Sequence, residues 1–119
     1  TYVSRDRNDY SSGIQLIKAH LAYYIGGMGQ YYFELFTRYG YEIECIQIRE
    51  AWALGDRQKA ASLIPFNMID KVAIIGDQLF CKEKLAIYRN LGIDVPILAF
   101  PHSSTLDSIT YTLEQLAPT

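Results

Sequence analysis

Apolar residues recur at the spacing of helical turns along most of the chain. Ile17 and Leu21 fall on one helical face, and Ser11 or Ser12 is a suitable N-cap at the start of that helix. The glycine run at residues 26–29 interrupts or kinks it. Pattern and cap signals predict five or six helices in all, over residues 12 to the glycine run, 31–39, 41–54, 57–63, 78–91 and 106–116.

Extended segments are few. Residues 1–3 are typical of the end of a strand, a short extended piece precedes Gly76, and the apolar run 93–100 predicts a strand. Pro96 lies in that run and favours a strand start or a sheet edge. One or two strands cannot form a sheet alone, because their backbone groups need partners. We therefore expect one of three situations. The strand pairs with a part of the protein outside this sequence, the chain associates with a second copy of itself, or the run 93–100 is not a strand.

The end of the chain has the order of an α/β protein. Helix 78–91, the glycine at 92, the apolar run, a polar loop and helix 106–116 follow one another as in a βα unit. Asp77 precedes the first of these helices and is a good N-cap for it. No repeat or domain boundary is visible, so we predict one segment, residues 1–119, of helix-rich α/β class.

Composition excludes several classes of protein. The chain has 119 residues, half of them apolar, and a net charge of −2. A nearly neutral chain without a basic stripe does not favour a nucleic-acid partner. No run reaches the roughly 18 apolar residues of a membrane span and no signal peptide opens the chain, so we expect a cytoplasmic protein. Cys45 and Cys81 lack the neighbours of a disulfide framework or zinc site and predict buried thiols; we expect no metal site.

The most informative stretch is residues 21–29. Gly26, Gly27 and Gly29 break a pattern that otherwise predicts a buried helix. Each glycine inside a helix costs roughly 0.5–1 kcal/mol relative to alanine. The run therefore indicates either a kink or tight helix crossing, or a place where a ligand approaches the backbone.

Four segments carry a resemblance to a known family. Residues 21–29, 31–41, 54–56 and 70–76 resemble, in this order, the C-terminal third of luciferase-like flavin-dependent oxidoreductases. The chain is most similar to the branch that uses the deazaflavin coenzyme F-420, related to methylenetetrahydromethanopterin reductase. The resemblance covers roughly residues 15–100. It implies that the chain is the C-terminal fragment of a (β/α)8 TIM barrel.

The resemblance implies hydride transfer between a cofactor, FMN or coenzyme F-420, and a small organic substrate. No catalytic constellation is visible, which this chemistry tolerates because the cofactor carries it. The fragment alone should be inactive. The glycine run belongs to an excursion near the barrel mouth in these enzymes, and it is predicted to contact the cofactor through Gly26, Gly27, Met28 and Gly29.

A second candidate cofactor site follows the last strand of the implied barrel. Barrel enzymes often bind phosphate after strands seven and eight. His102, Ser103 and Ser104 lie there, ahead of a helix, and are predicted to bind an anionic group of the cofactor. The alternative is an ordinary capping loop with an exposed histidine. Asp77 stands where the family usually has threonine, which disfavours an anion at that turn.

A non-enzymatic function is the alternative to the oxidoreductase. The tyrosine-rich helices over residues 12–39 and 41–54 carry apolar residues on two sides, as a dimerisation or interaction module would. The expected partners are therefore a small-molecule substrate, and the remainder of the barrel or a second copy of the chain in a homo-oligomer.

Overall fold

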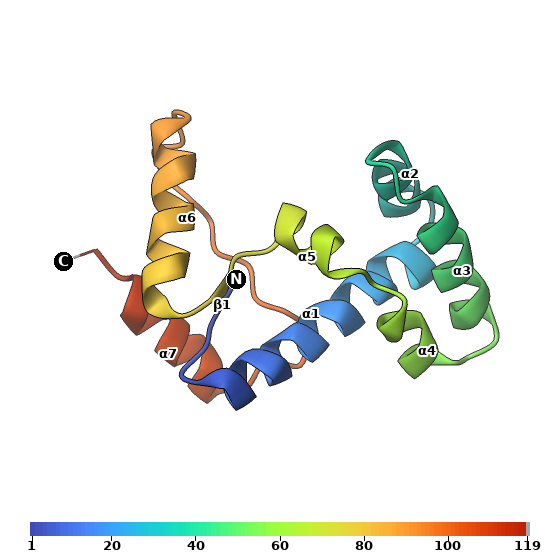
Figure 1. The fold of residues 1–119 in the computed structure, drawn as a ribbon, viewed down its shortest axis with the longest axis horizontal. Helices are drawn as coiled ribbons and strands as arrows, with labels where there is room; N and C mark the ends of the chain where they lie inside the picture. Colours follow the sequence, from blue (N-terminus) through green and yellow to red (C-terminus); the bar gives the residue numbers. More distant parts are fainter. Residues whose placement is uncertain (119) are drawn as a thin grey trace. The chain divides into compact units, whose positions relative to one another are not determined.

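The computed structural model describes residues 1–118, which contain seven helices and two short parallel strands (Figure 1). The helix-rich α/β class is confirmed, with seven helices where five or six were expected. The elements in chain order are β1 Tyr2–Val3, α1 Arg7–Gly27, α2 Tyr31–Arg38, α3 Glu42–Ala53, α4 Arg57–Ser62, α5 Phe66–Val72, β2 Ile75–Gly76, α6 Gln78–Asn90 and α7 Leu106–Leu116.

The chain forms two compact units, and the two boundaries between them fall inside α1 and at the last residue of α5. Unit 1 comprises residues 1–16 and the chain from Val72 onward. Unit 2 comprises Ile17–Lys71. The two candidate cofactor segments of the sequence therefore belong to different units.

Unit 1 is organised by its two strands. Tyr2 pairs with Ile75 and Val3 with Gly76 in parallel register. On the other side of β1, the Val3 amide donates to the Thr112 hydroxyl of α7 over 3.0 Å. The backbone nitrogen of Thr1 donates to the Ala99 carbonyl over 2.6 Å. Helix α7 and the segment before it thus satisfy the backbone edge that a third strand would otherwise occupy.

Unit 2 is a set of packed helices. Helix α3 packs against α2 and α4. The α3 side chains Cys45 and Ile48 are fully buried, as are Met68 and Ile69 of α5. On the other face of α3, Ile43 and its neighbours are exposed, so the two-sided apolar pattern of this helix corresponds to one buried and one exposed face.

Two expectations about element positions are wrong. Helix α1 begins at Arg7, ahead of Ser11 and Ser12, because the Asp6 carboxylate accepts the Asp9 amide over 2.8 Å and caps the helix earlier. The run 93–100 is not a strand within the described residues. Pro96 has no N–H to donate, and neither β1 nor β2 pairs with this segment in a ladder.

Candidate functional site

The glycine run serves mainly to end α1 and to admit a tryptophan. A Cβ at Gly26 would lie 2.7 Å from the Cβ of Trp52, and one at Gly27 would lie 2.8 Å from its indole nitrogen. Trp52 of α3 therefore occupies the space that these two glycines leave open. Gly29 has φ +77 and nothing within 4 Å of the Cβ position, as expected of a glycine just past a helix end. A cofactor role for Gly26 and Gly27 stays a prediction beside this packing role.

The turn between α1 and α2 is held by one arginine. Arg49 of α3 donates from Nη1 to Gln30 Oε1 over 2.8 Å and from Nη2 to the Gly29 carbonyl over 2.9 Å. Its guanidinium also lies over the Phe33 ring, 3.7 Å from the centroid. Helix α1 has no basic residue in its own last turn, so Arg49 supplies the positive charge that a helix C-terminus favours.

Aromatic rings support the exposed side of this turn. Tyr31 is 65% exposed and Met28 is 44% exposed. The Tyr31 ring meets Tyr32 edge-on with centroids 5.0 Å apart, and Tyr32 meets Tyr24 at 4.7 Å. Such edge-to-face contacts favour one ring orientation. The turn therefore presents an exposed apolar surface made of Met28 and Tyr31 on a rigid support.

The second candidate segment is a capping loop in unit 1. The Ser104 hydroxyl donates to the Pro101 carbonyl over 2.6 Å, and the Thr105 hydroxyl caps α7 by accepting the Ser108 amide over 3.1 Å. Ser103 has φ +64, the left-handed region that few side chains adopt. His102 and Ser103 are exposed. Thr105 is therefore the N-cap of α7, and Ser104 is not.

The loop before α7 has both a negative and a positive side chain near it. Asp107 lies in the first turn of α7 and forms an ion pair of 3.0 Å with Arg5. An anion at this helix start would share the helix dipole and Arg5 with that carboxylate. Anion binding by His102, Ser103 and Ser104 remains a prediction.

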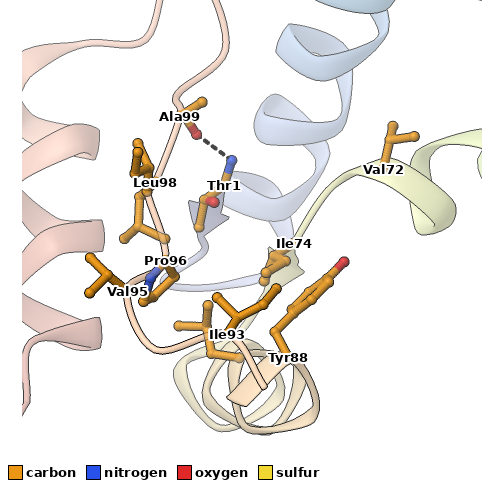
Figure 2. Close-up of a pocket in the computed structure, with 11 residues that line it drawn as sticks. Thr1, Val72, Ile74, Tyr88, Ile93, Val95, Pro96, Leu98 and Ala99 are labelled. Atoms are coloured by element: carbon orange, nitrogen blue, oxygen red, sulfur yellow. Dashed lines mark hydrogen bonds between the residues drawn. The ribbon is translucent and has the colours of Figure 1, made fainter. Parts of the chain in front are cut away.

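An apolar pocket in unit 1 lies beside the residues that precede β1 and β2. Its volume is about 430 Å³, within the range of small-molecule sites. Thr1 and Ile74, which line it, directly precede β1 and β2 respectively (Figure 2). The other lining residues are Val72, Leu85, Tyr88, Ile93, Val95, Pro96, Ile97, Leu98 and Ala99. None of the predicted cofactor residues lines it.

The remaining reactive groups are structural. Asp77 accepts the Phe80 amide over 2.8 Å, which confirms it as the cap of α6. Both cysteines are buried and free. Burial raises the pKa of the Cys45 thiol, and burial together with Asp77 raises the pKa of Cys81 to about 11. These thiols are therefore poor nucleophiles at neutral pH.

Residues 1–118 show neither of two other features. They contain no group of three or more histidine, cysteine or acidic side chains placed to hold a metal ion. None of their helices is both long and apolar enough to cross a membrane.

Sequence reasoning missed Arg49 and Trp52. Trp52 was visible only as an apolar position of the 41–54 helix, and Arg49 as one charge among several. Their partners lie about twenty or more residues away in the sequence, and no local spacing rule links them.

Comparison with known proteins gives one distant similarity. Over 95 residues the chain is 25% identical to a protein of Mycobacterium tuberculosis provisionally named as a coenzyme F420-dependent oxidoreductase. The alignment covers 76% of this chain and 27% of that protein, so the chain spans about a quarter of the relative's length. No protein-family profile matches the chain, and no solved structure matches it.

Proposed function

We propose that the chain is the C-terminal part of a luciferase-like (β/α)8 barrel oxidoreductase that uses coenzyme F-420. The similarity to the mycobacterial protein carries this proposal, because that protein's name specifies both an oxidoreductase and this coenzyme. The fold supports it. Strands β1 and β2 are parallel, and each leads into a helix, α1 and α6 respectively, as in a barrel.

The protein's part in the chemistry is to position the coenzyme. When bound, the deazaflavin ring supplies the hydride chemistry with a small organic substrate. In unit 2, Met28 and Gly29 lie at the exposed turn and would contact the ring. In unit 1, His102, Ser103 and Ser104 would bind an anionic group of the coenzyme. The chain alone is expected to be inactive, and the remainder of the barrel or a second copy of the chain is its expected partner.

Cofactor titration tests this function. We expect the protein, expressed as its gene encodes it, to quench the fluorescence of coenzyme F-420 saturably and to bind FMN more weakly. Preference for FMN would move the protein to the flavin branch of the class. Failure to bind either ring would overturn the proposed function.

Two variants test the two candidate segments separately. Met28→Ala probes unit 2, and its control is Leu54→Ala, which removes a side chain of that unit that is 85% exposed. Ser103→Ala probes unit 1, and its control is Ser11→Ala, an exposed serine of the same unit. Weaker coenzyme binding by a site variant, but not by its control, would support a cofactor contact in that unit, and each unit is judged by its own pair of variants.

A helical interaction module is the second candidate. It is favoured by an exposed apolar surface of α3 and the residue after α2: Tyr39 is 48%, Ile43 69% and Ile46 43% exposed. Such exposure is typical of an interface. If Ile43→Glu lowers the mass of an oligomer in sedimentation analysis and no cofactor binds, the interaction module replaces the oxidoreductase as the proposed function.

A further inference from the structure

The exposed turn between α1 and α2 is held by side-chain hydrogen bonds from another helix. The Gln30 carbonyl accepts the Glu34 amide of α2 over 2.9 Å, but the Gln30 side chain makes no cap hydrogen bond to α2. The Gln30 side chain and the Gly29 carbonyl are instead bound by the two terminal nitrogens of the Arg49 guanidinium. A planar fork of this kind fixes two acceptors at once, which a lysine ammonium cannot do in the same way.

Arg49 is itself held in place by α2 and α3. Its guanidinium stacks on Phe33 in the first turn of α2, and its backbone belongs to α3, which packs against α2. The turn is therefore tied to both α2 and α3 through one residue. Rigid support of exposed residues is what binding sites require, because a preorganised surface loses little freedom when a ligand binds.

We infer that Arg49 is a positioning residue, which fixes the Gly29–Gln30 turn so that Met28 and Tyr31 form a preorganised apolar wall for the coenzyme ring. This inference rests on the proposed function. A polarisable thioether and a tyrosine supported edge-on by Tyr32 suit a flat aromatic ring. Arg49 itself acts through the turn and does not touch the ring.

The test compares arginine variants in the protein as its gene encodes it, with coenzyme F-420 and FMN as probes. For Arg49→Ala we expect ring binding at least tenfold weaker and a KM for the coenzyme raised more than kcat is lowered. Arg49→Lys should recover part of the affinity, since the ammonium can still bond one acceptor. The control is Arg38→Ala, which removes an exposed arginine of the same unit that donates to the Glu34 carbonyl over 3.5 Å.

A milder variant keeps the inference testable if Arg49→Ala does not fold. Gln30→Ala removes one of the two acceptors from an exposed position, and we expect a smaller loss of ring affinity with an unchanged thermal midpoint. Hydrogen exchange of the amides at residues 29–31 should quicken in both variants but not in Arg38→Ala.

The outcomes separate the two proposals. If the wild-type protein binds neither ring, the proposed function fails and the inference fails with it. If the wild type binds and Arg49→Ala and Gln30→Ala bind equally well, the function stands and the positioning role is overturned. If Arg38→Ala weakens binding as much as Arg49→Ala, the effect is one of general charge and the inference is also overturned.

Discussion

The two units of the chain differ in how completely they bury their apolar residues. Unit 2 has a core of its own, in which Ile25, Ile48 and Ile69 are fully buried. Unit 1 has strands of only two residues, and the run beside its pocket leaves Val95 79% and Ile97 93% exposed. Strongly apolar residues exposed in an unpaired segment are typical of a surface that binds another segment or another molecule. Unit 2 therefore has a helical core of its own, whereas unit 1 leaves the apolar run 93–100 largely at its surface.

The largest expected effect lies in the core of unit 2. Ile48→Ala removes a fully buried side chain, and such truncations cost about 2–5 kcal/mol. We expect this loss in urea unfolding followed by the fluorescence of Trp52, the single tryptophan of the sequence, which lies in unit 2. A cost below about 1 kcal/mol would mean that unit 2 is loosely packed and would weaken the contrast between the units.

A smaller effect is expected in unit 1, where stability depends on a hydrogen bond. Thr112→Val removes the acceptor of the Val3 amide, and a buried donor left without a partner costs about 1–3 kcal/mol. Thr110→Val makes the same chemical change at an exposed position of α7 and should be nearly neutral. The measurement is urea unfolding by circular dichroism and by Trp52 fluorescence in parallel. An equal shift of both signals would show that the units unfold together.

The sequence predicted local features well and long-range ones poorly. The cap residue Asp77 binds an amide three residues away, so its position just before a helical pattern located it. The early start of α1 was missed because two serines competed with Asp6 as caps. The run 93–100 was predicted as a strand from its apolar composition, but a strand also requires a paired neighbour, and composition does not show one.

The candidate site shows the same division. The sequence singled out the glycine run, but the partner of Gly26 and Gly27 is Trp52, and the residue that fixes Gly29 is Arg49. Both partners come from α3, beyond the whole of α2. Helix packing brings them to the turn, and no motif in the chain states which side chains will meet there.

The pH dependence of unit 1 is a third, more moderate test. Burial, and then the hydrogen bond of 2.6 Å to Asp9, raises the pKa of Tyr2 from its ordinary 10.0 to about 12. The unfolded chain thus loses this proton at lower pH than the folded one, so the stabilisation is complete below pH 10 and is lost as the pH rises through 12. At pH 11 we expect the free energy of unfolding of the wild type to be lower by about 1 kcal/mol because of this proton.

Tyr2→Phe isolates this contribution from the other tyrosines. The variant lacks the hydrogen bond at every pH. The difference in free energy of unfolding between the wild type and the variant should therefore shrink between pH 10 and 12. Urea midpoints measured at pH 8, 10 and 11 give the comparison. A deficit that stays constant over this range would show that Tyr2 keeps an ordinary pKa in the folded protein.

The smallest expected effect tests the exposed apolar run 93–100 of unit 1. Ile97→Ala makes the same substitution as Ile48→Ala, but at a side chain that is 93% exposed, and exposed substitutions usually change stability by less than about 0.5 kcal/mol. In the 119-residue chain we therefore expect urea unfolding by circular dichroism to be unchanged. In the protein as its gene encodes it, a cost of several kcal/mol would show that another segment or copy covers Ile97, whereas a neutral result there too would remove the contrast in burial as a reason to place unit 1 at the end of a barrel.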